Sequence, residues 1–127
     1  MMERIVVTEK EKIRETLFRA KQSVEAEDIE IINLIDPSFR YQNFGFEDLK
    51  ENIINFYNRF DRIKIDLDLK WIVLVETSAT CSGLARVTAW TDSMPVLIFG
   101  KILSRSPIRI ELNKRDGRWL IRGIDAH

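Results

Sequence analysis

The segment IKIDLDLKWIVLV, residues 63–75, constrains the fold of this chain more than any other feature. Its apolar side chains recur at every second position: Ile63, Ile65, Leu67, Leu69, Trp71, Val73 and Val75. The intervening Lys64, Asp66, Asp68 and Lys70 would point the other way, because successive side chains of a strand alternate between two faces. The pattern predicts one long strand with a buried face.

The rest of the C-terminal half predicts further long strands. In residues 79–89 one face carries only small side chains, which let another element approach the sheet closely. Residues 96–113 form the next strand, with a bend near residues 104–107, because Pro107 cannot donate within a ladder. Asp116 and Gly117 then form a turn, and residues 118–125 form the last strand.

The N-terminal half has helical signals instead. Thr8 and Glu11 have the spacing of a capping box, and apolar residues at helical spacing extend the helix over residues 9–25. Asp28 can cap a short second helix, which Pro37 ends. A third helix covers residues 46–60. Helices followed by strands indicate an α+β fold, and residues 1–127 suit a single domain.

This layout resembles the nuclear transport factor 2-like superfamily, which includes ketosteroid isomerase, scytalone dehydratase and polyketide cyclases. Besides the amphipathic first helix, the resemblance is carried by AEDIEIINLIDPSF, GFEDLKENIINFY and the closing LNKRDGRWLIRGID. It implies a cone with a possible pocket, in which three N-terminal helices pack on a strongly curved, mostly antiparallel sheet. It also implies a homodimer formed through the convex face of the sheet.

Within such a cone, five residues are expected to line the pocket: Tyr41, Phe56, Trp71, Trp119 and Ile121. Tryptophan walls favour a small, flat, apolar ligand. The alternative is an interaction module whose cone is filled by its own side chains.

A second alternative is an enzyme of the isomerase, dehydratase or cyclase type, which needs an acid or base in a dry pocket. On strict alternation Asp125 shares a face with Trp119, so it would lie at the pocket mouth with a raised pKa. Tyr41 is the other candidate, as a donor to an oxyanion. The competing interpretation is a solvated Asp125 and a Tyr41 that fills the core. His127, as the last residue, is expected to be a mobile tail.

The opposite face of the sheet predicts an interface, because large apolar side chains there would otherwise meet water. The expected dimer residues are Ile72, Leu84, Trp90, Phe99 and Leu103, with Arg86, Lys101 and Arg105 as a charged rim. A bulge would shift the register and move some of these side chains inward.

Composition excludes several other classes. The formal net charge is zero, so no affinity for nucleic acid is indicated. No apolar run approaches the roughly 18 residues that span a membrane. With one Cys and one His, neither a disulfide nor a metal site is expected, and no phosphate-binding loop or other cofactor motif is present. A cytoplasmic location is the default expectation.

Overall fold

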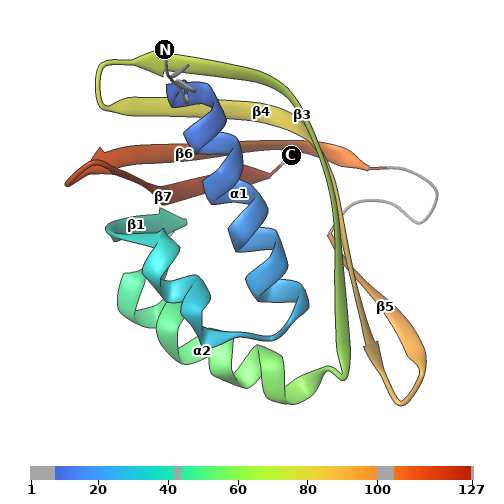
Figure 1. The fold of residues 1–127 in the computed structure, drawn as a ribbon. Coiled ribbons are helices and arrows are strands. Elements are labelled where there is room, and N and C mark those ends of the chain that lie inside the picture. Colours follow the sequence, from blue (N-terminus) through green and yellow to red (C-terminus); the bar gives the residue numbers. More distant parts are fainter. Residues whose placement is uncertain (1–7, 42–43, 100–104, 127) are drawn as a thin grey trace, which may run out of the picture.

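A computed structural model describes residues 8–41, 44–99 and 105–126 of the chain (Figure 1). In chain order its elements are α1 (Glu9–Glu25), the 3-10 helix η1 (Ile29–Leu34), β1 (Ile35–Tyr41), β2 (Phe44–Gly45), α2 (Phe46–Arg59), β3 (Arg62–Val75), β4 (Ser78–Thr91), β5 (Met94–Phe99), β6 (Ser106–Arg115) and β7 (Arg118–Ala126).

The first two helical segments begin at a side-chain cap, as the sequence predicts. The Thr8 hydroxyl accepts a hydrogen bond from the Glu11 amide at 3.2 Å, and the Asp28 carboxylate accepts one from the Glu30 amide at 3.0 Å. At the start of α2, the Asp48 carboxylate reaches back to the Gly45 amide at 2.9 Å. These bonds satisfy donors that the first turn leaves unpaired.

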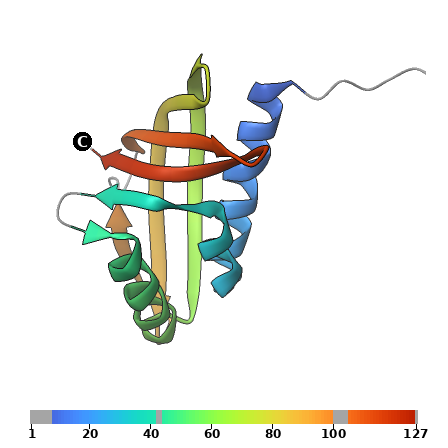
Figure 2. The ribbon, with the colours of Figure 1, turned by 90° about the vertical axis from the view of Figure 1, so that its left-hand side faces the viewer.

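The strands form one sheet in the order β2-β1-β7-β6-β4-β3, and β5 pairs with β4. The β1–β7 pair is parallel, and all other pairs are antiparallel. β3 and β4 bend strongly, so that the sheet curves around α1, while α2 lies near β1 at the lower end (Figures 1 and 2). The α+β cone that the sequence predicts is therefore confirmed, with a 3-10 helix as the second of its three helical segments.

The strand expected over residues 96–113 is two strands in the structure. β5 pairs with the second half of β4, at residues 87–91, and β6 pairs with the first half, at residues 78–85. Because β4 runs the length of the sheet, these two short strands lie one after the other along the same edge of β4.

The core lies between α1, η1 and the concave face of the sheet. Its buried side chains come from both halves of the chain: Ile13, Leu17, Ala20, Ile31, Ile35, Phe39, Ile72, Ala79, Cys81, Ile110, Leu112, Trp119 and Ile121. The face of small residues on β4 is buried as predicted, and it faces the helices.

Candidate functional site

A β-bulge in β3 decides which side chains face the core. Leu69 pairs with Gly83 and Trp71 pairs with Ser82, so Lys70 is one extra residue on β3. A Cβ on Gly83 would overlap the Asp68 carbonyl oxygen and lie 2.9 Å from the Leu69 Cα. Gly83 therefore gives the bulge the space that it needs.

The bulge inverts the alternation along the second half of β3. Ile72 is buried in the core, whereas Trp71, Val73 and Val75 are 68%, 57% and 64% exposed. The expectation that Trp71 lines the interior is wrong, and so is the expectation that Ile72 lies on the outer face. Beyond the extra residue, the side chains predicted to face the core face outward, and those predicted to face outward face the core.

Trp119 and Ile121 do face the interior, but they fill it. Trp119 is 3% exposed and Ile121 is 5% exposed, and both belong to the core cluster with Leu112 and Cys81. Burial raises the pKa of the Cys81 thiol to about 11, so the thiol is neutral. These side chains are packed in the core; Trp119 also borders the wide groove beside α1, whereas none of the hollows described below opens onto Ile121.

The indole of Trp119 is anchored by a carboxylate at the start of α1. Its Nε1–H donates to Glu9 Oε2 at 2.7 Å, and the ammonium groups of Lys114 and Lys12 donate to Glu9 Oε1 at 3.1 and 3.2 Å. The bond from Trp119, followed by that from Lys114, lowers the pKa of Glu9 to about 2. Glu9 is thus a permanently ionised structural group at pH 7.

A second polar cluster joins β1 to β6. Asp36 is fully buried, and its carboxylate accepts hydrogen bonds from Arg115 Nε at 3.1 Å and Arg115 Nη2 at 3.2 Å. The amide and hydroxyl of Ser38 donate to the same carboxylate at 2.8 and 2.6 Å. Burial raises the pKa of Asp36, but the bonds from Arg115 and Ser38 outweigh it, so the pKa lies below its ordinary value. Both carboxylate oxygens of Asp36 therefore accept hydrogen bonds from within the fold.

Asp125 does not share the face of Trp119, because β7 has a bulge of its own. Leu112 pairs with Ile121 and Glu111 pairs with Gly123, which leaves Arg122 as the extra residue. Beyond this bulge Ile124 faces inward, and Asp125 is exposed opposite Arg109. The placement of Asp125 at a pocket mouth is therefore wrong.

The side chains of four other predicted residues lie outside the part of the chain that the structure describes. The backbone of Tyr41 lies at the end of β1, opposite Phe44, but its side chain is outside the described part, as is that of Phe99 in β5. Leu103 and His127 lie outside the described residues. The predicted roles of these four side chains stay predictions.

The outer face of the sheet carries two hollows near tryptophans. The Trp71 hollow, of about 450 Å³, is bounded by Lys70, Trp71, Ser82, Gly83, Leu84, Pro107, Ile108 and Arg109. The Trp90 hollow, of about 500 Å³, is bounded by Arg62, Lys64, Asp66, Arg86, Thr88, Trp90, Pro95 and Leu97. The predicted interface residues Leu84 and Trp90 line these hollows and are half-buried.

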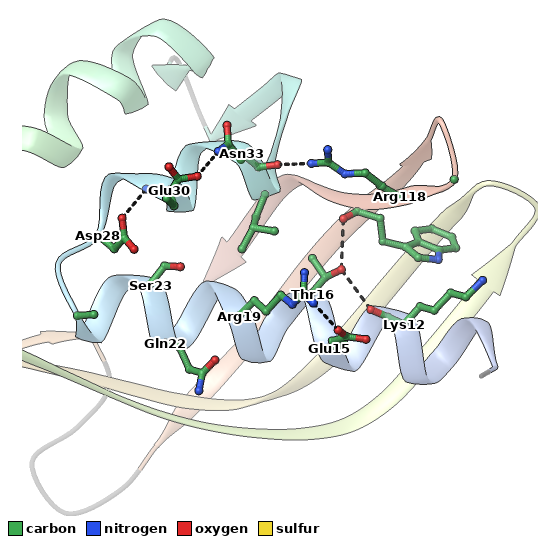
Figure 3. A pocket seen from close by; sticks show the side chains of 14 residues that line it. Lys12, Glu15, Thr16, Arg19, Gln22, Ser23, Asp28, Glu30, Asn33 and Arg118 are labelled. Carbon is green, nitrogen blue, oxygen red and sulfur yellow. Dashed lines mark hydrogen bonds and ion pairs between the residues drawn. The ribbon is translucent and has the colours of Figure 1, made fainter. Parts of the chain in front are cut away.

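A wider groove lies between α1, η1 and the β6–β7 turn, and the sequence patterns do not indicate it (Figure 3). Its volume is about 760 Å³, and most of the residues that line it are polar or charged. Many of these polar groups already bind one another: Arg19 pairs with Glu15 at 2.8 Å, Arg118 donates to the Asn33 carbonyl at 2.8 Å, and Asn33 donates to Glu30. The groove thus offers few free groups that converge on a ligand.

A fourth hollow, of about 330 Å³, lies along α2 and includes the predicted ligand residue Phe56. Leu49, Ile53 and Phe56 form its apolar part, and Asn52, Asn55 and Arg59 form its polar part. Phe56 also contacts Phe60, with ring centroids 4.9 Å apart. The hollow is lined by residues of α2 alone, so it is not the predicted pocket inside the cone, and the role of Phe56 in ligand binding stays a prediction.

Over the described ranges, no three His, Cys, Asp or Glu side chains gather in a group that would hold a metal ion. Within the same ranges, no helix has the length and apolar character to cross a membrane.

No protein-family model matches the sequence, and no curated protein does. Solved structures match it closely in shape. A nuclear transport factor 2-like protein with a cystatin-like fold from Novosphingobium aromaticivorans superposes with a TM-score of 0.72 at 16% identity, covering 92% of this chain and 79% of that one.

Two proteins of unknown function are equally similar. The first, with a cystatin-like fold, is from Nostoc punctiforme and has a TM-score of 0.71 at 18% identity, with 98% of this chain and 93% of that chain covered. The other is from Mycobacterium tuberculosis, with a TM-score of 0.72 at 18% identity and coverage of 91% and 73%. At these identities the likeness concerns the fold. The chain has the cystatin-like fold of the first two of these structures.

Proposed function

We propose that this chain is a filled-cone interaction domain that forms a homodimer through the outer face of its sheet. The observation that carries the proposal is the exposure of Trp71, Val73 and Val75 along one side of β3. Three large apolar side chains in a row are an unusual solvent face for a monomer. The interior supports the same function, because Trp119 and Ile121 are packed there as core.

The occupant that best fits this face is a second copy of the chain. The lining of the Trp71 hollow is mostly apolar, and Lys70 and Arg109 are its charged residues, a mixture typical of an interface. Both signs of charge are present on β3 next to the hollow: Asp68, which pairs with Leu84, lies 2.7 Å from the Lys70 ammonium and 3.7 Å from the Arg105 guanidinium. In a two-fold interface the same patch meets its own copy, so a patch that carries both signs can pair opposite charges across the axis.

Light scattering coupled to gel filtration tests the dimer. The wild-type chain is expected to elute as a dimer at micromolar concentration, and Trp71→Lys is expected to elute as a monomer with unchanged circular dichroism. Phe18→Lys is the matched control, because Phe18 is 56% exposed but lies on α1, so this variant should stay dimeric. A wild-type chain that is monomeric at high micromolar concentration would overturn the proposal.

A second candidate function, binding of a small apolar molecule, is favoured by the hollow along α2. Its apolar wall is formed by Leu49, Ile53 and Phe56. Toluene is a suitable probe, with the methyl signals of Ile53 followed by NMR. Phe56→Ser should remove the shifts that toluene causes. Unchanged Ile53 signals at saturating toluene would remove this candidate.

A further inference from the structure

The Trp90 hollow is built by the register of three strands. On the outer face Arg62 pairs with Trp90, and Trp90 pairs with Pro95. In the next row Lys64 pairs with Thr88, and Thr88 pairs with Leu97 at the far side. A third row places Asp66 opposite Arg86. The side chains of these rows therefore stand together on one face, as period-two alternation requires.

The charges of the Trp90 hollow favour an anion. Its rim carries three cations, Arg62, Lys64 and Arg86, against the single carboxylate of Asp66. Asp66 is engaged by Arg86 at 3.0 Å, so it does not neutralise the other two cations. Within the described ranges Lys64 forms no ion pair, and its side chain is exposed. An apolar wall beside these cations would lower the local dielectric constant and so strengthen their attraction for an anion.

The other wall of the hollow is flat and apolar. The Arg62 guanidinium lies 4.7 Å from the centre of the Trp90 ring, which fixes the cation over the indole face. Pro95 and Leu97 line the side of β5, and Leu97 is 38% exposed. A volume of about 500 Å³ lies within the range of small-molecule sites. The shape and the charge together fit a flat ring that carries a negative group.

We propose that the Trp90 hollow is a binding site for a planar aromatic carboxylate. The ring lies against Pro95, Leu97 and the side of Trp90 that Arg62 does not cover, and the carboxylate meets Lys64 and Arg62. The Thr88 hydroxyl, at the centre of the middle row, is placed to donate to the same carboxylate. This site is separate from the Trp71 hollow, which lies over β6 and the first half of β4.

The probe that tests the site is 2-naphthoate, compared with the uncharged 2-naphthalenemethanol. The chain has three tryptophans, so indole N–H signals in ¹H–¹⁵N NMR can be assigned with three Trp→Phe variants. With 2-naphthoate, the signal of Trp90 is expected to shift in a saturable way and that of Trp119 to stay in place. The uncharged analogue should bind at least about tenfold more weakly, as measured from the same signal, because it lacks the negative charge that the cations attract.

Charge reversal at one exposed position isolates the electrostatic contribution to the affinity for 2-naphthoate. Lys64→Glu is expected to weaken 2-naphthoate binding by about tenfold or more, and Lys64→Met by about fivefold. Lys10→Glu, on the exposed side of α1, is the matched control and should leave the affinity unchanged. Trp71→Lys, which tests the dimer, should also leave it unchanged, so that the two proposals fail separately.

Three outcomes would overturn the site: equal shifts with the acid and the alcohol, affinity that Lys64→Glu does not change, or shifts at Trp71 in place of Trp90. Each would show that the naphthalene ring binds without the cations of this hollow.

Discussion

The indole Nε1 of Trp119 lies 2.7 Å from a carboxylate oxygen of Glu9, which joins the start of β7 to the first turn of α1. The two residues are 110 positions apart in sequence. The contact therefore forms only when the sheet has closed around the helix. The contact also places the negative charge of Glu9 in the first turn of α1, where the dipole of the helix backbone favours an acidic side chain.

This contact predicts a pH dependence of stability. The pKa of Glu9 is about 2 in the folded chain and near 4.5 when the chain is unfolded. Because the folded pKa is depressed, the stabilisation is fully present above pH 4.5 and is lost as the pH falls toward 2. Glu9→Gln should lower the free energy of unfolding at pH 7 and flatten its decline between pH 4.5 and 2. Urea unfolding at several pH values measures both effects.

Glu51→Gln is the control for this test, because Glu51 is an exposed acidic residue on α2. It should leave the pH profile as it is in the wild type. A Glu9→Gln profile parallel to that of the wild type would mean that the carboxylate gains nothing from Trp119 and Lys114.

A second prediction concerns the buried Asp36. Arg115→Met leaves the Asp36 carboxylate with Ser38 as its remaining partner, and a buried charge that loses a partner is costly. Because Arg115 is itself half-exposed, water can replace part of the loss, so we expect about 2 kcal/mol of destabilisation. Urea unfolding at pH 7 measures this value. The double variant Asp36→Asn/Arg115→Met should regain part of it.

The exposed pair Arg19–Glu15 provides the comparison. Its oxygen–nitrogen distance of 2.8 Å is shorter than those of the Asp36 pair, yet both side chains are more than half exposed. Arg19→Met should therefore cost no more than about 0.5 kcal/mol. Equal losses from the two Met variants would contradict the role assigned to burial.

The third prediction uses the thiol of Cys81. Cys81 is fully buried beneath α1, and burial raises its pKa to about 11. The reactive form of a cysteine is the thiolate, so the folded chain should react with a disulfide reagent such as DTNB far more slowly than a free thiol. In 6 M urea the same thiol should react at the ordinary rate. Rapid stoichiometric reaction of the native chain would show that the core opens at this position.

Much of the fold follows from local sequence signals. The capping group Thr8, the alternation from Ile63 to Leu69 and the Asp116–Gly117 turn predict elements that the structure contains. What could not be predicted is the orientation of side chains beyond an extra residue. A bulge depends on how two strands meet, and period-two counting within one strand does not detect it. For this reason period-two counting predicts the wrong face of the sheet for both Trp71 and Asp125.

One signal for the first bulge was present in the sequence. Gly83 is the glycine in the run of small residues on β4, and a glycine within a strand often marks a bulge or a close backbone approach. The sequence alone does not show which strand lies opposite Gly83, so it does not place the bulge at Lys70. The hollows on the outer face depend on three strands in register, which is why no single stretch of sequence indicates them.

The last prediction tests the bulge through that glycine. A Cβ at position 83 would overlap the backbone of Asp68 and Leu69, and backbone cannot rotate away as a flexible side chain can. Gly83→Ala should therefore destabilise the chain by about 2 kcal/mol or more, measured by thermal or urea unfolding. Gly123→Ala, in β7 of the same sheet, is the matched control, because a Cβ there would meet the Arg40 carbonyl oxygen at 3.4 Å, an ordinary contact. Similar losses from the two substitutions would show that the bulge does not need its glycine.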